Sequence, residues 1–344
     1  MNRSLRALVP LLMAGCLATV APAQPRQLEP GSILLYPQVD SRLGAGRGTI
    51  INVTNTNSSR IVFPNNLRGG DVRLHYNYVA GTVPWGLTDL AEFLTPNDTL
   101  TVLAGDHNPQ MELGFLLVIA TDIETETAID FDYLIGSEIV VDVVGDEIWD
   151  LPAIPFKALI TGGPRSGTGH FFTDPLANGG NANGAVDFDG IEYDYWPDKL
   201  YLDSFHQVSA LVTGDLILVS LLGQDFRISV GFLIYDNEED VFSRTFDFIC
   251  WTSVTLDQIS NVFRNLGGNP NEFRSGWCRI DGSGAVNLLT GVIWRNEGGS
   301  GTYSPPIMGS FVQRMLMAPT FGAGDLLHQT GFQNGNEFPP DNVN

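Results

Sequence analysis

The chain has 344 residues and carries 39 acidic against 18 basic side chains, which gives a formal net charge of −21. A charge of this sign repels nucleic acids and anionic lipid surfaces, so we exclude nucleic acid as a partner. The hydrophobic content of 43% excludes a chain that is disordered throughout. The length alone favours two domains.

The first residues have the pattern of an export leader. Two early arginines precede an apolar run over residues 7–20, and Ala21-Pro22-Ala23 supplies a cleavage site. We therefore predict a signal peptide at 1–23 and a mature chain that is secreted, periplasmic or on the cell surface. Cys16 offers the alternative of a lipoprotein anchor, but the apolar run continues past it, so we favour cleavage. Later apolar stretches fall short of the ~20 residues that cross a bilayer, which predicts a protein that is not transmembrane.

After the leader, short apolar runs alternate with polar turns. Residues 72–79 place apolar side chains on one side and polar ones on the other, which is typical of a half-buried strand. Residues 115–121 are apolar on both sides, as expected for a strand buried in the middle of the structure. Residues 226–235 alternate again. These runs predict an all-β protein.

One stretch of the first half occurs again in the second. A shift of 117 residues relates three pairs of short segments, and the shift then falls to 115 residues across a predicted turn. Turns tolerate such length changes, whereas a slip inside a strand moves every side chain to the other face. The matched segments are Leu74-x-Tyr76-x-Tyr78 with Ile191-x-Tyr193-x-Tyr195, Asp98 with Asp215, Gly114-Phe115-Leu116 with Gly231-Phe232-Leu233, and Phe131-Asp132-Tyr133 with Phe246-Asp247-Phe248.

The repeat and the strand pattern together predict an architecture. Alternating strands bury one face only, so two sheets must close on each other. We predict two tandem Greek-key, immunoglobulin-like β-sandwich domains related by internal duplication. They span 24–146 and 147–320, the second with additional strands, and a flexible tail follows at 321–344. The alternative is a single two-sheet jelly roll built from both copies.

Two cysteines, Cys250 and Cys278, remain after the leader. Cysteines of an exported chain can pair, so we predict a disulfide between them that ties the last segment to the second repeat. In the chain-entropy model its loop would contribute about 3 kcal/mol to stability. The alternative is a pair of buried free thiols.

The best candidate for a metal site is a loop rich in asparagine, glycine and aspartate. Asn181, Asn183, Asp187 and Asp189 offer oxygen atoms at alternating positions, which suits calcium. The alternative, which we favour, is an Asn/Gly turn that enters a strand. We predict no other cofactor.

Catalytic motifs are absent from the sequence. It contains no Gly-x-Ser-x-Gly, no His-Glu-x-x-His and no phosphate-binding loop. His107 follows Asp106, and His206 lies near Asp203, so each could form an acid–base pair, although a solvated pair in a loop is commoner. We therefore assign no catalytic residue and predict that the protein is not an enzyme.

Aromatic residues offer a further candidate site for sugar rings. Tyr193, Tyr195 and Trp196 lie close in sequence, and Trp85 lies in the first half. The two tyrosines match positions on the apolar side of residues 72–79, so we expect these rings to pack in the core. The ligand stays unspecified.

The order of several segments resembles an uncharacterised group of exported bacterial β-sandwich proteins. The segments are GSILLYP, NVTNTN, EFLTPNDTLTVLA, GFLLVIATD, DFDYLIG and a late GWCRIDG. The resemblance implies export and a compact fold, and it implies no activity or ligand. We expect an exported, non-enzymatic protein with a structural, adhesive or protein-contact role in the envelope or outside the cell. The alternative is a calcium-assisted carbohydrate-binding module, so the partner is a protein or a glycan.

Overall fold

A computed structural model describes residues 29–58, 70–81, 87–108, 112–159, 186, 188, 192–194, 196–222, 226–266, 274–293, 305–316, 320–326 and 328–329. Within these residues, eighteen strands account for most of the regular structure, and the helices are about one turn long. The prediction of an all-β protein is confirmed. None of the described helices has the length and apolar character needed to cross a membrane.

The N-terminal half contains nine of the strands. They are β1 (Ile33–Asp40), β2 (Arg47–Asn55), β3 (Val72–Ala80), β4 (Leu87–Leu94), β5 (Thr99–Leu103), β6 (Leu113–Thr121), β7 (Leu134–Asp142), β8 (Glu147–Pro152) and β9 (Ile154–Phe156). A short 3-10 turn, η1 (Leu43–Ala45), follows β1, and a single helical turn, α1 (Ala104–His107), follows β5.

The C-terminal half contains the other nine. They are β10 (Lys199–His206), β11 (Val212–Val219), β12 (Phe226–Asp236), β13 (Val241–Ile249), β14 (Trp251–Thr255), β15 (Ser275–Asn287), β16 (Met308–Met315), β17 (Thr320–Leu326) and β18 (His328–Gln329). Two short turns of helix, α2 (Leu256–Ile259) and η2 (Asn261–Arg264), follow β14.

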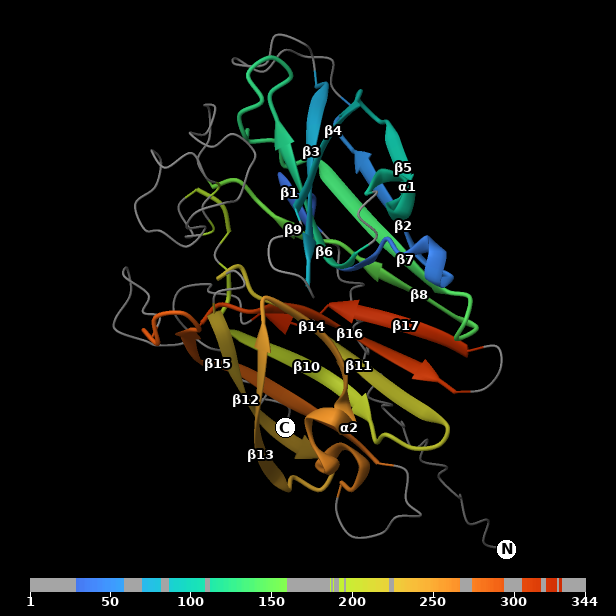
Figure 1. Cartoon of the computed structure of the whole chain (residues 1–344), viewed down its shortest axis with the longest axis vertical. Coiled ribbons are helices and arrows are strands. Elements are labelled where there is room, and N and C mark those ends of the chain that lie inside the picture. Colours follow the sequence, from blue (N-terminus) through green and yellow to red (C-terminus); the bar gives the residue numbers. More distant parts are fainter. Residues whose placement is uncertain are drawn as a thin grey trace, which may run out of the picture.

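The strands form two hydrogen-bonded sheets that divide into four layers (Figure 1). The five-stranded sheet, ordered β4-β3-β6-β1-β9, is the N-terminal five-strand layer. The thirteen-stranded sheet contains the N-terminal four-strand layer (β8-β7-β2-β5), the C-terminal four-strand layer (β14-β11-β16-β17) and the C-terminal five-strand layer (β18-β10-β15-β12-β13). The last two layers meet at Cys250, where a positive φ of 57° turns the chain between β13 and β14.

The strand order repeats between the halves. Each strand of the N-terminal half has its counterpart nine strands later, so β4-β3-β6-β1-β9 becomes β13-β12-β15-β10-β18, and β5-β2-β7-β8 becomes β14-β11-β16-β17. This offset differs from the predicted one. The shift of 117 residues aligned β5 with β11, but β5 pairs with β2 alone, whereas β11 pairs with both β14 and β16. The predicted alignment is wrong because apolar triplets mark a strand without saying which neighbours it has.

Parallel pairing of β8 with β17 joins the halves into one sheet. The described residues therefore do not support two tandem Greek-key domains, because a continuous ladder of hydrogen bonds runs from one half into the other. The pairing also corrects the start of the flexible tail predicted at 321–344, of which residues 330–344 lie outside the described residues. Residues 321–326 belong to β17, which has a neighbour on each side. The predicted boundary between residues 146 and 147 falls at the turn before β8 and stays a prediction.

Three strands of the N-terminal five-strand layer, β1, β3 and β6, are buried on both faces. Leu116 and Val118 of β6 pack in one core with Ile51 of β2. Phe115 and Leu117 project the other way, into a larger core that also contains the apolar side chains of β11. This confirms that residues 115–121 form a strand that is buried on both sides. The layer lies between the two four-strand layers, which places the seam between the halves next to β1 and β6.

Candidate functional site

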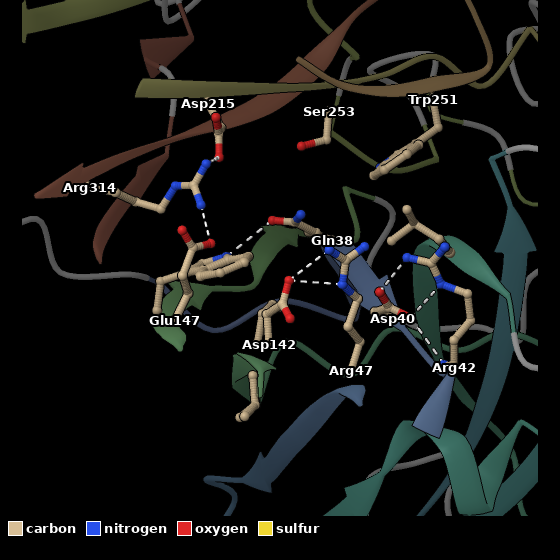
Figure 2. A pocket seen from close by; sticks show the side chains of 14 residues that line it. Gln38, Asp40, Arg42, Arg47, Asp142, Glu147, Asp215, Trp251, Ser253 and Arg314 are labelled. Atoms are coloured by element: carbon tan, nitrogen blue, oxygen red, sulfur yellow. Dashed lines mark hydrogen bonds and ion pairs between the residues drawn. The ribbon is translucent and has the colours of Figure 1, made fainter. Parts of the chain in front are cut away.

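A cavity of about 240 Å³ opens at this seam (Figure 2). Its walls come from β1, β2, β6, β7 and β8 of the N-terminal half and from β11, β14 and β16 of the C-terminal half. Its lining combines three arginines, four carboxylates and two tryptophans.

Two tryptophans, one from each half, hold the end of β1 beside the cavity. The register of β1 against β6 shifts between Tyr36 and Val39, which frees the intervening backbone from the ladder. Trp149 of β8 donates its indole N–H to Gln38 Oε1 at 3.1 Å. Trp251 of β14 donates to the carbonyl of Pro37 at 2.7 Å. The bulge therefore positions Gln38 on the cavity wall, clamped by both halves.

Two ion pairs line the N-terminal side of the cavity (Figure 2). Arg42 donates to both oxygens of Asp40, at 2.9 Å and 2.6 Å. Arg47 donates from Nε to Asp142 Oδ2 at 2.8 Å. Burial tends to raise the pKa of Asp142, but hydrogen bonds from the Gly145 N–H and from Arg47 outweigh it, so this pKa is lowered. Asp142 therefore stays ionised.

A third ion-pair cluster crosses the seam itself. The Arg314 guanidinium of β16 lies between Asp215 of β11, with Nη2 at 2.5 Å from Oδ2, and Glu147 of β8. It also lies over the Trp149 ring at 5.5 Å from the centroid, in a cation–π contact. Burial raises the pKa of Asp215, and the charge of Arg314 opposes this effect. Asp215 Oδ1 and Arg314 Nε have no hydrogen-bond partner within the described residues.

The charges of this cavity are already paired with one another. Each of its three arginines contacts a carboxylate of the same chain, so none is left to hold an incoming anion. Its hydroxyl group, on Ser253, has no histidine among the lining residues to act as a base. The arrangement is therefore suited to holding the two halves in a fixed relation.

A second feature is the outer face of the N-terminal four-strand layer. The inward residues of these strands enter the cores, and their alternating neighbours face out. Asp150 is the one charged residue at these outward positions. The outward side chains are Ile50, Asn52, Thr54, Thr99, Thr101, Leu103, Ile135, Ser137, Ile139, Val141, Ile148, Asp150 and Pro152.

The other outer layer of the molecule has a different chemistry. The outward positions of the C-terminal five-strand layer include Arg227, Asp247, Arg279 and Asp281, as expected for a solvated surface. The C-terminal four-strand layer corresponds to the uncharged one in strand order, and its central strand β11 is buried over its whole length. The N-terminal half therefore covers the four-strand layer of the C-terminal half, whereas the equivalent layer of the N-terminal half keeps its uncharged face on the outside.

The predicted calcium ligands Asn181, Asn183, Asp187 and Asp189 lie outside the described residues. Among the described residues, three acids come close enough together to share a metal ion: Asp236, Glu238 and Asp240. A guanidinium already lies there, because Arg274 is 3.6 Å from Asp236 Oδ2 and 3.0 Å from Glu238 Oε1.

The predicted disulfide is wrong. Cys250 and Cys278 are both free and buried. Cys278 points inward from the middle of the C-terminal five-strand layer, whereas Cys250 sits at the corner between β13 and β14. Burial raises the pKa of both thiols, that of Cys250 to about 12, which keeps them protonated and unreactive. The structure instead agrees with the alternative prediction, a pair of buried free thiols.

The aromatic candidates that the structure describes belong to the core, whereas the histidine candidates do not, because His107 is half-buried and His206 is exposed. Tyr193 and Trp196 are fully buried, and the Trp196 ring stacks on Phe156 at 5.1 Å. Tyr195 and Trp85 lie outside the described residues. His107 accepts or donates a hydrogen bond with Tyr78 Oη at 2.8 Å and lies 3.5 Å from Glu92, so its acidic neighbour is not Asp106.

The cavity residues were not found from the sequence. They come from eight strands that are far apart in the chain, so no local spacing connects them. The sequence held one indication of this site. Because the chain has only 18 basic residues in 344, each arginine next to an apolar run was a candidate for a buried ion pair.

Comparisons with known proteins supply no identity. No family model matches the chain, and no curated protein matches it. One similar solved structure is a chain of the "Cryo-EM Atomic Structure of Broad Bean Stain Virus (BBSV)", at 10% sequence identity. The match covers 83% of this chain and 92% of that one with a TM-score of 0.16, and a score this low carries no argument.

Proposed function

We propose that the chain is an exported, non-enzymatic protein that acts in the envelope or outside the cell by contact with another macromolecule. The contact surface is the uncharged outer face of the N-terminal four-strand layer. The observation that carries this proposal is one charged residue, Asp150, among the outward positions of four strands in a chain with a net charge of −21. A solvated sheet face normally carries polar and charged side chains, and an extended face without charge marks an interaction site.

The ion pairs at the seam support the same role. A contact protein needs a rigid frame, and the pairs formed by Arg314 with Asp215 and Glu147 hold the frame together. The repeated strand order further supports the proposal that the two halves arose by internal duplication, each as a sandwich of one four-strand and one five-strand layer. In this view the four-strand layer of the C-terminal copy became part of the seam between the halves. The outer face of the four-strand layer of the N-terminal copy stayed on the outside of the molecule.

The proposal is tested by placing charge at the centre of the face. Asn52 and Ser137 lie opposite each other on β2 and β7. The variant Asn52→Asp with Ser137→Lys introduces two charges that attract each other, so the sheet is expected to fold. The control is Thr245→Lys, on the exposed side of β13, where charges already occur.

The measurement is co-sedimentation of the labelled mature protein with envelope fragments of the cells that produce it. We expect wild type and Thr245→Lys to sediment with the fragments, and the two-charge variant to bind at least about tenfold less, because removing even a paired set of charges from water costs more than their mutual attraction returns. Equal binding by all three proteins, or no binding by wild type, would refute the proposal.

A second candidate is carbohydrate binding in the cavity. The observation in its favour is two indole rings, Trp149 and Trp251, beside the polar groups Gln38 and Ser253. At about 240 Å³ the cavity is smaller than most ligand pockets, which span roughly 300–1,000 Å³. A glycan array probed with and without a calcium chelator separates the two functions: a sugar signal that Trp251→Ala removes would favour this candidate.

A further inference from the structure

The two sheets end in four edge strands, and three of them are protected. An edge presents unpaired backbone N–H and C=O groups, which proteins shield with charge, proline or short length. Of the described edges, β4 carries Asp89 and Glu92, β9 is three residues long and contains Pro155, and β18 is two residues long. None of these three edges offers a long, uncharged strand to another chain.

The fourth edge, β5, has none of these protections. Its sequence is Thr-Leu-Thr-Val-Leu, and it pairs with β2 in a continuous register. The Asn55 N–H donates to the carbonyl of Asp98 at 2.9 Å. Because residues of an antiparallel pair bond to their partner strand alternately, Leu100 and Val102 bond to β2. Thr101 therefore turns both its N–H and its C=O to the free side of β5, at the margin of the N-terminal half (Figure 1).

The C-terminal half shows what lies on this side of the equivalent strand. By strand order β14 is the counterpart of β5, and β13 lies beside it at the outer end of the four-strand layer. The two strands pair at Ile249 and Trp251. At β5 the corresponding position holds no strand from the described part of the chain. An extended polypeptide segment is therefore the kind of occupant that this position accepts.

Two acidic side chains flank the free edge. Asp98 precedes β5 and Asp106 lies three residues beyond its end, and both are exposed. Among the described residues neither carboxylate forms an ion pair. In a chain with a net charge of −21 these acids repel an acidic segment, a second copy of this chain included, and attract one with basic residues at its ends.

We propose that β5 binds an extended segment of another protein, about five uncharged residues flanked by arginine or lysine, as an added antiparallel strand. Such strand addition takes its affinity from main-chain hydrogen bonds and its specificity from side chains. Segment residues beside Leu100 and Val102 continue the inner face, where these two side chains pack against the core, so they are apolar. Their alternating neighbours continue the uncharged outer face, which suits threonine and valine.

The basic ends of the segment lie near the two flanking aspartates. The proposal does not rest on the function proposed for the outer face, because it uses backbone groups of the edge. It is tested with purified components, so a peptide can bind at β5 even if envelope fragments do not bind the outer face. The failure of one proposal is therefore distinguishable from the failure of the other.

The probe is the capped peptide Arg-Arg-Thr-Val-Thr-Val-Thr-Arg, labelled with an uncharged dye and measured by fluorescence polarisation with the mature protein. In the antiparallel register its two leading arginines lie towards Asp106 and its last arginine lies towards Asp98. We expect a dissociation constant below about 1 mM at low salt. Two control peptides are expected to bind at least about tenfold more weakly: one with glutamate in place of arginine, and one N-methylated at the central threonine, which loses a main-chain hydrogen bond.

Variants of the protein test the same contacts from the other side. Thr101→Pro removes an N–H that faces the free side, a position where an edge strand tolerates proline, and is expected to weaken binding at least about fivefold. Its control, Thr101→Val, keeps the N–H and is expected to bind as wild type does. Asp98→Asn combined with Asp106→Asn is expected to weaken binding about three- to tenfold, whereas Asp247→Asn, on the exposed side of β13, leaves it unchanged.

Four results would overturn the proposal. They are no binding of the arginine-flanked peptide at about 1 mM, equal binding of the glutamate-flanked peptide, equal binding of the N-methylated peptide, and a folded Thr101→Pro variant that binds as wild type does. The N-methylated peptide leaves the protein unchanged, so the hydrogen bonds are tested even if Thr101→Pro unfolds. A wild type that dimerises and takes no peptide also overturns the proposal, in favour of a second copy of this chain at the edge.

Discussion

Removing the Arg314 guanidinium at the seam is expected to cost several times more stability than removing an exposed arginine. Arg314 is 13% exposed and lies between Asp215, also 13% exposed, and Glu147, 17% exposed. The variant Arg314→Met keeps much of the contact with Trp149 but leaves two largely buried carboxylates without a counter-charge. Breaking a buried ion pair in this way costs about 3–5 kcal/mol. The assay is urea unfolding at pH 7, followed by tryptophan fluorescence, which reports on Trp149 beside the substituted side chain.

Two further variants decide whether the cost is electrostatic. Arg264→Met removes an arginine that is 59% exposed and pairs with Asp257, so we expect a loss of less than about 1 kcal/mol. Combining Arg314→Met with Glu147→Gln and Asp215→Asn removes all three charges and is expected to recover most of the lost stability. A loss for Arg314→Met no larger than that of the control, or a triple variant as unstable as the single one, would refute the reasoning.

Three other predictions concern buried groups. Burial raises the pKa of Glu138, so the folded state holds its proton more tightly than the unfolded state, and stability falls as pH rises above about 4.5. Glu138→Gln should therefore be more stable than wild type at pH 7, with a gap that grows by at most about 1.4 kcal/mol per pH unit, measured by unfolding at several pH values. Gly136→Ala should lose about 1–3 kcal/mol, because its Cβ would overlap the Tyr36 hydroxyl; a neutral result in the same assay contradicts the packing. Since Cys250 and Cys278 are unpaired, dithiothreitol should leave Tm unchanged, and a drop would mean that a disulfide exists.

The class of fold and the position of many strands were predictable from local pattern. Residues 72–79 form β3 (Val72–Ala80), as their alternation predicts, but the prediction that this strand is half-buried is wrong, because His75 and Asn77 on its polar side are buried as well. Residues 115–121 are apolar on both sides because two cores enclose β6. In both cases the signal for a strand lies within the strand itself, but side-chain alternation shows only which side is apolar and does not show whether other parts of the chain cover the polar side.

The partners of each strand were not predictable in the same way. The match of Asp98 with Asp215 was a real likeness of sequence, yet it joined an edge strand with a central one. Hydrogen bonding between strands involves backbone groups that every residue carries, so the side-chain pattern does not name the neighbour. The free thiols have the same explanation: an export leader shows that cysteines can pair, but only the distance between Cys250 and Cys278 in the fold decides whether they do.

The residues that line the cavity were the hardest to predict, because only the tertiary structure brings them together. Arg314 meets Asp215 and Glu147 only because β17 pairs with both β16 and β8 and so places the two strands in one sheet. No spacing in the chain predicts a cluster whose members are separated by the whole C-terminal half.

By itself the sequence determined the strongly acidic character, the alternation that makes the chain all-β, and the absence of recognisable catalytic motifs, because composition and periodicity are local properties. The tertiary structure alone decided that the repeat is nine strands long, that the two halves share one sheet, and which faces and edges stay uncovered. Those features come from long-range pairing of backbone groups, and every strand offers the same groups until the fold selects its neighbours.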